Sequence, residues 1–457
     1  MNKNKSGDTC IIVGAGIAGL AASIRMSMSG RKVIILESNA FVGGKISEKR
    51  IGDFRFDIGP SLLTKPEYIS ELFTLCGKNS EHYLQFEKLD NLFRFFFTDG
   101  TSIDLFSDRA KLQEELLDKT EEPFENITEV LKASELIYEL THEVFLERSL
   151  HKIRNYFNKA TLKGLLRFYK VRTFETMHHY NSRKLSDQRL VQIFDRYASY
   201  NGSNPFKAPA TLNVINHFEL NEGAYFPVGG MQAIVSALHK LADDCGVQIQ
   251  TNTRVDEILV QNGKVSGVRI ADKVLESSCV ICNVDISTAY NKLLPSVSKP
   301  QFVLKQEGSS SAVVFLWGLK KVFAEVGLHN TFFGNDDKSE YDSIFEKQEV
   351  SDDPSFYLYN SSLKNPSDAP PGMSNWFVMV TAPSDSGQDW KLIVQKVRLH
   401  VLRKIQELLG ENIEEYIGVE EVLTPLHFAK HTGSWNGSIY GSSSNGILSA
   451  FLRHPNF

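Results

Sequence analysis

The sequence predicts an α/β fold in which a βαβ dinucleotide-binding domain is interleaved with a second domain of mixed sheet and helices. Three observations support this prediction. The N-terminal residues read as strand, glycine-rich turn, helix and strand, and a similar pattern resumes near residue 223. Between them lies a long stretch with a different charge pattern. The chain of 457 residues is long enough for two or three domain-sized units.

The first predicted elements form a dinucleotide site. An apolar strand over residues 10–13 runs into a glycine-rich turn, and helix-compatible residues follow. The first glycine permits a tight turn, the second lets the backbone approach a pyrophosphate, and the third allows close helix packing. The helix N-terminus then offers unpaired N–H groups to the phosphates. The residues of this turn are Gly14, Ala15, Gly16, Ile17, Ala18 and Gly19.

A second strand, residues 32–36, ends in Glu37, at the distance where a carboxylate can hydrogen-bond a ribose hydroxyl. This Rossmann-like fingerprint fits NAD or FAD alike. Two later segments favour FAD. Gly43-Gly44-Lys45 offers a second backbone approach and a cation, which suit an extended cofactor with its own pyrophosphate contacts. Gly59-Pro60-Ser61 forms a stiff, small-residue turn that could lie under a flat ring.

The intervening region begins with a predicted β-hairpin over residues 91–106. Phe93, Phe95 and Phe97 alternate toward one face, and Asp99-Gly100 is a strong turn signal. Residues 113–150 are expected to be helical and acidic. Their glutamates spaced by four are expected to form a solvated face; these are Glu135, Glu139, Glu143 and Glu147.

The charge then changes sign, with eleven Lys and Arg against two acids from Arg148 to Arg189. Within this stretch, residues 158–171 place apolar side chains on one helical face and cations beside it. Such a helix can lie in a bilayer interface with its lysine stems snorkelling. The alternative is an ordinary amphipathic helix that packs on the protein's own core.

The dinucleotide-binding half resumes with a glycine turn, a helix and a strand, followed by a β-hairpin around Asn262-Gly263. Cys279 and Cys282 form a CxxC, but a zinc ribbon would need a second pair. Their segment reads as a strand, so we expect buried strand cysteines in a reducing compartment and no metal. The predicted domains alternate as residues 1–88, 89–222, 223–289, 290–420 and 421–457, with the first, third and fifth forming the dinucleotide-binding half.

Composition excludes some classes of function. Hydrophobic residues make up 42% and charged residues 23%, which is ordinary for a soluble protein. The net charge of −5 argues against nucleic acid as the main partner. The N-terminus lacks the apolar core of a signal peptide, and no run approaches the roughly 20 apolar residues that span a bilayer. We therefore expect a protein that is soluble or lies on a membrane surface.

Several stretches together resemble bacterial carotenoid desaturases of the phytoene-desaturase superfamily, which is flavin amine oxidase-like. They are VGAGIAGL, the VGGK loop, FRFDIGPS, YFPVGGM, CNVD and TPLHF with GSIYG. Residues 56–78 and 194–213 are most similar to the 1-hydroxycarotenoid 3,4-desaturase branch. In the superfamily, a residue at the position of Val255 meets the adenine with its backbone.

The resemblance implies an enzyme with FAD that removes two hydrogens from adjacent carbons of a C40 carotenoid. The hydride would go to the flavin N5 and the electrons to oxygen or a membrane quinone. The branch would form the C3–C4 double bond beside a tertiary alcohol at C1. A C40 chain is effectively insoluble in water at about 0.8 kcal/mol per buried CH₂. The substrate would therefore be drawn from the bilayer, and a cytoplasmic, peripherally membrane-associated enzyme is expected.

Catalytic residues are not fixed by the sequence. Hydride transfer needs positioning first, because the cofactor carries the difficult step. Candidates for the proton acceptor are Glu147, His178, His179 and His217, each of which has an ordinary structural interpretation. Arg196 together with Tyr197 could orient a substrate hydroxyl. The thirty phenylalanines would suit an apolar tunnel, although most are expected in the core.

Three alternatives remain open: phytoene desaturase itself, another flavin oxidase such as an amine or protoporphyrinogen oxidase, and a non-catalytic prenyl-lipid carrier on the same fold. Carriers tend to lose the ring-side flavin contacts, which residues 43–45 and 59–61 retain. In the resembled family a glycine-rich segment follows the GSIYG region and covers the flavin. The sequence ends where that segment would begin, so we expect the 457-residue chain to retain flavin weakly.

Overall fold

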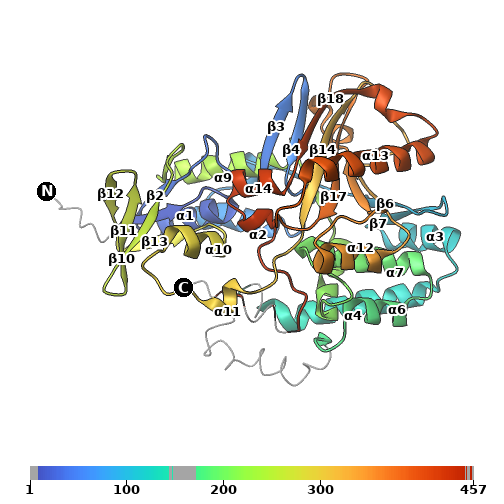
Figure 1. Ribbon diagram of the computed structural model, residues 1–457, viewed down its shortest axis with the longest axis horizontal. Coiled ribbons are helices and arrows are strands. Elements are labelled where there is room, and N and C mark those ends of the chain that lie inside the picture. Colours follow the sequence, from blue (N-terminus) through green and yellow to red (C-terminus); the bar gives the residue numbers. More distant parts are fainter. Residues whose placement is uncertain (1–8, 144–146, 148–170, 448, 450–452, 455–457) are drawn as a thin grey trace.

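The computed structural model describes residues 9–143, 147, 171–447, 449 and 453–454. Figure 1 shows the two parts of the chain side by side. One end holds the N-terminal elements with the hairpin strands β10 (Glu257–Gln261), β11 (Lys264–Ile270) and β12 (Lys273–Glu276). The other end holds a large sheet with helices on both of its faces.

A four-stranded parallel sheet carries the glycine-rich turn. Its strand order is β13 (Cys279–Cys282), β1 (Thr9–Val13), β2 (Lys32–Leu36) and β9 (Gln248–Gln250). Alternate residues of β1 face opposite sides, as the two-residue period of a strand requires. Cys10 and Ile12 pack on α1 (Ile17–Met28) and α9 (Gln232–Asp244). Ile11 and Val13 pack instead on the sheet formed by β10, β11 and β12.

The hairpin predicted around Asn262-Gly263 is confirmed, since β10 and β11 pair in antiparallel fashion across it. Both turn residues have positive φ, 51° and 72°, as a two-residue hairpin turn requires. The CxxC segment is confirmed as strand β13. Its cysteines, however, are half-buried rather than buried. The physical reason is that β13 is an edge strand with β1 as its one neighbour in the sheet.

The second sheet has seven strands and two covered faces. Their order is β18 (Ile417–Leu423), β14 (Ser311–Leu319), β17 (Ser374–Ala382), β16 (Phe356–Tyr359), β15 (His329–Phe332), β6 (Asn91–Phe96) and β7 (Ser102–Phe106). One face packs on α13 (Trp390–Leu409). The other packs on α3 (Arg109–Lys119), α4 (Phe124–His142), α6 (Met177–Lys184) and α7 (Gln188–Asp195). Because both faces are covered, all nine residues of β14 are buried.

The predicted hairpin over residues 91–106 is confirmed as β6 and β7. Phe93, Phe95 and Phe97 lie in the core on the side of α4, α6 and α7, whereas Phe96 faces α13. The acidic segment is helical over α3 and α4, with a break at residues 120–123, and residues 144–146 and 148–150 lie outside the described residues. The glutamates at 135, 139 and 147 are exposed as predicted, whereas Glu143 is half-buried. The basic helix predicted over residues 158–171 lies almost wholly outside the described residues, so its membrane role stays a prediction. The described helices include none that is both long enough and apolar enough to cross a bilayer.

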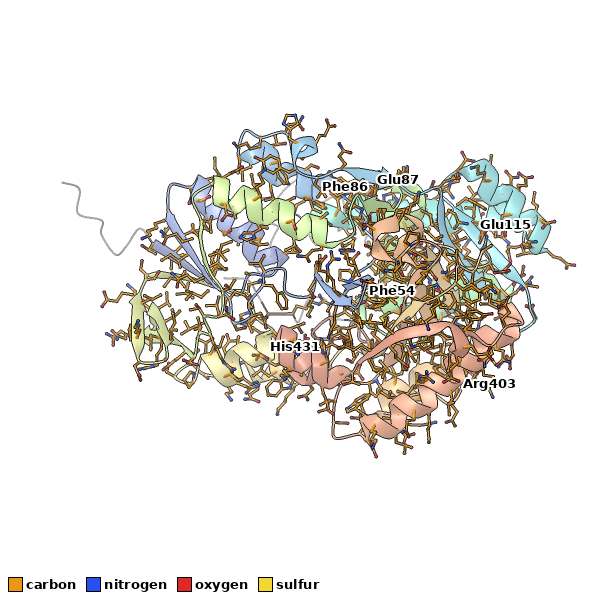
Figure 2. All side chains as sticks on the ribbon, turned by 90° about the horizontal axis from the view of Figure 1, so that it is seen from above. Phe54, Phe86, Glu87, Glu115, Arg403 and His431 are labelled. Atoms are coloured by element: carbon orange, nitrogen blue, oxygen red, sulfur yellow. The ribbon has the colours of Figure 1, made fainter. Side chains whose placement is uncertain are left out.

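Shorter elements complete the described chain. The paired strands are β3 (Ser47–Ile51) with β4 (Phe54–Ile58), and β5 (Phe86–Lys88) with β8 (Tyr225–Pro227). The short helices are α2 (Glu67–Leu75), α8 (Val214–Asn216), α10 (Ile286–Thr288), α11 (Gln301–Leu304), α12 (Asp337–Asp342) and α14 (Pro425–Thr432). Phe54, on β4, lies near the centre of the molecule, where the core side chains crowd together (Figure 2).

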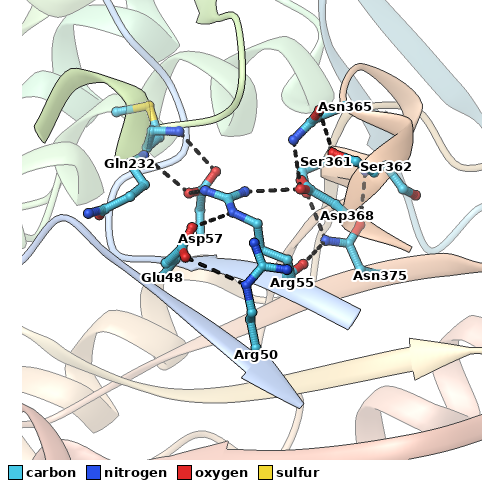
Figure 3. Close-up of polar contacts among 12 residues, drawn as sticks. Glu48, Arg50, Arg55, Asp57, Gln232, Ser361, Ser362, Asn365, Asp368 and Asn375 are labelled. Atoms are coloured by element: carbon cyan, nitrogen blue, oxygen red, sulfur yellow. Dashed lines mark hydrogen bonds and ion pairs between the residues drawn. The ribbon is translucent and has the colours of Figure 1, made fainter. Parts of the chain in front are cut away.

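A buried ionic cluster joins the two sheets (Figure 3). Arg55, on β4, donates to Asp57 at 2.7 Å, to Asp368 at 3.1 Å and to Glu48 at 2.5 Å. Asp57 also accepts the backbone N–H of Met231 at 3.0 Å, which fixes the start of α9. The Arg55 carbonyl accepts from Asn375 on β17 at 2.6 Å. The cluster therefore ties the glycine-rich half to the seven-stranded sheet. The predicted domain boundaries stay a prediction.

Candidate functional site

The glycine-rich turn has no room for side chains. Gly14 has a φ of 97° and donates its N–H to the Leu36 carbonyl at 2.9 Å. A Cβ added at Gly19 would lie 2.1 Å from the Gly14 carbonyl oxygen. Among the described residues, no side chain caps α1, and its first turn holds no acid. The first N–H groups of α1 therefore remain available to an anion.

Glu37 is buried at the end of β2 and faces the turn. One carboxylate oxygen accepts the Ala15 N–H at 2.8 Å. The other accepts the N–H and the side-chain amide of Asn39, at 2.8 and 2.9 Å. Because a carboxylate has about four acceptor positions, the oxygen on Ala15 can still accept from a ribose hydroxyl. The predicted position of the acid beside the turn is thus the one the structure shows.

The VGGK loop lies against the glycine-rich turn. Gly43 donates its N–H to the Ala15 carbonyl at 2.9 Å, and Gly16 and Gly43 form an isolated parallel bridge. A Cβ at Gly44 would lie 3.0 Å from the Cα of Gly16. Two backbone segments thus approach the same place without side chains. Lys45 adds a cation that donates to the Ile439 carbonyl, and burial lowers its pKa while Asp285 opposes that effect.

The small-residue turn adjoins this loop. Gly59 has a φ of 136°, and a Cβ there would lie 2.0 Å from the Lys45 carbonyl oxygen. Pro60 is exposed and Ser61 half-buried. The Ser61 hydroxyl shares a 2.7 Å hydrogen bond with the Tyr357 hydroxyl on β16. The turn therefore lies between the glycine-rich half and the seven-stranded sheet.

Two further residues complete the glycine-rich half. Val255 is buried against β1 and β2, and within the described chain its N–H and C=O take part in no hydrogen bond. Asn283, which directly follows β13, was not among the predicted site residues. Its side chain lies 3.1 Å from where a Cβ on Gly16 would stand, and its N–H donates to Val13. The only sequence signal was its place in CNVD, immediately after a strand.

These groups fit a flavin dinucleotide. The free N–H groups of α1, together with a backbone that has no side chains at Gly14, Gly16 and Gly44, suit a pyrophosphate. Glu37 suits a ribose, and the unpaired backbone at Val255 suits an adenine edge. Lys45 and the turn at residues 59–61 extend the cradle toward the second sheet. The role of each residue in holding the cofactor stays a prediction.

The candidate catalytic residues lie in different surroundings. His178 shares a 2.6 Å hydrogen bond with Asp195, which raises its pKa. His179 and Glu147 are exposed on the surface. His217 is buried and stacks on Tyr138, and burial lowers its pKa. The structure thus does not bring the four proton-acceptor candidates together.

Arg196 lies elsewhere, over the ring of Phe93 with its Cζ 4.1 Å from the ring centroid. Its guanidinium donates to the Tyr200 hydroxyl at 3.1 Å and pairs with Glu219 at 3.5 Å. Tyr197, predicted to act with it, instead donates to Glu219 at 2.7 Å. Arg196 is therefore held in a buried polar cluster that adjoins the seven-stranded sheet.

The family model for flavin containing amine oxidoreductase matches residues 17–448, nearly the whole chain. The chain belongs to this family. This membership identifies the protein as a flavin-dependent oxidoreductase.

One relative is a 1-hydroxycarotenoid 3,4-desaturase from Flavobacterium sp. (strain P99-3), 40% identical, with 98% of this chain and 91% of the relative covered. A 4,4'-diapolycopene oxygenase from Methylomonas sp is 32% identical, covering 100% and 92%. A zeta-carotene-forming phytoene desaturase from Myxococcus xanthus is 31% identical, covering 97% and 86%. An oxidoreductase structure from Methanosarcina mazei matches with a TM-score of 0.60 at 14% identity, covering 97% and 99%. The structural match shows the fold.

Proposed function

We propose that this flavin-containing oxidoreductase is a carotenoid desaturase that forms the C3–C4 double bond of a 1-hydroxylated carotenoid, with FAD as its flavin. The observation that carries the proposal is the 40% identity to a 1-hydroxycarotenoid 3,4-desaturase over 98% of the chain. The identity to a phytoene desaturase is lower, at 31%. FAD rather than a mononucleotide is supported by the open backbone, the acid at Glu37 and the uncapped start of α1.

The reaction removes one hydrogen from each of two neighbouring carbons and leaves a C=C bond. When bound, the flavin supplies the acceptor for the hydride. The protein positions both reactants and excludes water. Its core on the side of α4, α6 and α7 is apolar, with Phe93, Phe95 and Phe377 on the sheet face. The accompanying proton must go to a base or to water, and oxygen or a membrane quinone would reoxidise the flavin.

The substrate would be drawn from a membrane. A carotenoid is too apolar to be free in water, so we propose peripheral contact with the bilayer and a cytoplasmic site of action. The basic segment at residues 148–189 supports this contact by its charge and its apolar spacing. A protein that released no carotenoid product unless liposomes were present would agree with this proposal.

The test uses the full chain with FAD in liposomes that carry either a 1-hydroxylated acyclic carotenoid or phytoene. Visible absorbance and product separation follow the reaction. One added double bond with the hydroxylated substrate alone is the expected result. Stepwise colour from phytoene would move the protein to the earlier desaturation, and an oxygenated product would favour the oxygenase relatives. Bound flavin with no product from either substrate would refute the desaturase proposal.

A further inference from the structure

Polar side chains lie at the centre of an otherwise apolar face of the seven-stranded sheet. His329 and Thr331 project from β15 toward the helices α4, α6 and α7, beside Phe93 and Phe95 of β6. Tyr359 projects on the same side from β16. His329 and Tyr359 are each 2% exposed and Thr331 is 5% exposed. A sheet face built only to pack would hold apolar residues at these positions.

Several polar atoms of this group have no partner within the described chain. They are Nε2 of His329, Oγ1 of Thr331, the hydroxyl of Tyr359 and Nε of Arg196. A buried donor or acceptor that loses water without gaining a partner destabilises the fold. His329 and Arg196 both adjoin the ring of Phe93, so a polar group of a ligand that reaches this ring would complete the hydrogen bonds of their free nitrogens.

The two nitrogens are fixed around the same aromatic ring. Arg196 Cζ lies 4.1 Å from the centroid of Phe93, and the His329 ring stacks on Phe93 at 5.1 Å. The side chain of Arg196 is 10% exposed, and the charge of Glu219 compensates it. Glu219 is itself fully buried and accepts from Tyr197 and Tyr200. Because the cluster already contains its counter-ion, it does not require an anionic ligand.

The chemistry of the free atoms matches an alcohol. Arg196 Nε–H is a donor only. His329 shares a 2.6 Å hydrogen bond with Tyr357 through Nδ1, and burial lowers its pKa to about 3, with the charge of Arg196 adding to the effect. The ring is therefore neutral, and Nε2 donates or accepts according to tautomer. A hydroxyl can accept from Arg196 and pair with either tautomer of His329.

We infer that His329 and Arg196, with the hydroxyl of Thr331 on the same face of β15, bind the C1 hydroxyl of the carotenoid and so determine substrate specificity. This inference rests on the proposed function. It also agrees with the position of Tyr357, which bonds both His329 and Ser61 of the turn predicted to lie beside the flavin. In the substrate, C1 is two bonds from C3, so the group that holds the hydroxyl must adjoin the reacting carbons.

The test compares the full chain with FAD and its variants on two carotenoids that differ only in the C1 hydroxyl. His329→Phe keeps an aromatic ring in the stack between Phe93 and Tyr359 and removes the nitrogens. Thr331→Val removes one hydroxyl at nearly constant shape, and it tests the inference if His329→Phe does not fold. Tyr180→Phe is the matched control, because it removes a buried, unpartnered hydroxyl on α6 from a ring that lies against Arg172 and Arg183 rather than against His329.

We expect each test variant to lower kcat/KM for the hydroxylated substrate about tenfold and to leave the unhydroxylated one unchanged. A second readout is the affinity of the same proteins, in liposomes, for the hydroxylated product, which does not react further. This affinity should fall in the test variants in parallel with kcat/KM, while the control variant keeps the wild-type values. Wild-type ratios in His329→Phe or, if that variant does not fold, in Thr331→Val would overturn the inference. Absence of turnover by the wild-type protein would instead refute the proposed function.

Discussion

Replacing Gly19 by alanine tests the flavin cradle most directly. The glycine is helical, so the substitution adds no backbone strain. The new Cβ would stand 2.1 Å from the Gly14 carbonyl oxygen and 2.9 Å from the Asn283 side-chain nitrogen. Relief of the first contact requires α1 to retreat by about 1 Å, and overpacking of this kind typically lowers folding stability by about 1–3 kcal/mol. The same retreat withdraws the first N–H groups of α1 from the phosphates, so we expect FAD affinity to fall by about 10- to 100-fold, or about 1.4–2.8 kcal/mol.

The assay is equilibrium dialysis with FAD, because unfolding temperature responds only weakly to such energies in a chain of this length. Gly327→Ala is the matched control: an added Cβ there meets its nearest neighbour at 3.5 Å, an ordinary contact. We expect the control to bind FAD as the wild-type protein does. Wild-type affinity in Gly19→Ala would show that the turn does not hold the pyrophosphate, and the proposed cradle would be wrong.

Three other predictions follow from the buried charges. Glu37→Gln should weaken FAD binding about tenfold in the same dialysis, since the amide N–H₂ would face an N–H donor. Arg55→Met should lower the free energy of unfolding, measured in urea, by about 3–5 kcal/mol, because buried carboxylates lose their partner. In the control, Arg25→Met removes one partner of a half-exposed ion pair and should lower the free energy of unfolding by no more than about 1 kcal/mol. Burial raises the pKa of Glu340 from 4.5 to about 8, so the folded state binds the proton more tightly. The contribution of this protonated carboxyl group to the free energy of unfolding is complete below the unfolded pKa and is lost as pH rises toward 8. Glu340→Gln should therefore gain stability relative to the wild-type protein over that interval. A difference in urea unfolding between the two proteins that stays constant from pH 5 to 8 would contradict this.

The glycine-rich turn and its acid could be predicted because their signals are local. Gly14, Gly19 and Glu37 lie within two dozen residues; Gly14 and Glu37 each directly follow a strand, and Gly19 lies in the first turn of a helix. The same holds for the hairpin at Asn262-Gly263, whose turn chemistry requires positive φ. Patterns of this kind report short-range geometry, which the chain determines without distant contacts.

The remaining site residues depend on contacts between distant segments. Arg55 and Asp368 are 313 positions apart, and no spacing rule connects them. His329 occupies a buried strand position where apolar residues are usual, so only its neighbours Tyr357 and Phe93 reveal its free nitrogen. Asn283 directly follows a strand, and its approach to Gly16 is also a contact between distant segments that no sequence pattern indicates. The prediction that Cys279 and Cys282 are buried was wrong for a related reason, because the four residues of β13 do not indicate that the strand lies at the edge of its sheet.

The two helices that pack on the parallel sheet differ at their N-termini, and the difference supports the assignment of the phosphate site. At α9, Asp57 accepts the N–H groups of Met231 at 3.0 Å and Gln232 at 3.4 Å, so this protein supplies its own anion there. At α1, no described side chain takes that place, and two of the three residues before the helix, Gly14 and Gly16, have no side chain. The first N–H groups of a helix have no partner within the helix, and a bound anion can supply one. The uncapped N–H groups at the start of α1 therefore suit a phosphate. An aspartate at the N-cap position would accept from these N–H groups itself, so Gly16→Asp should abolish FAD binding while leaving α9 unaffected.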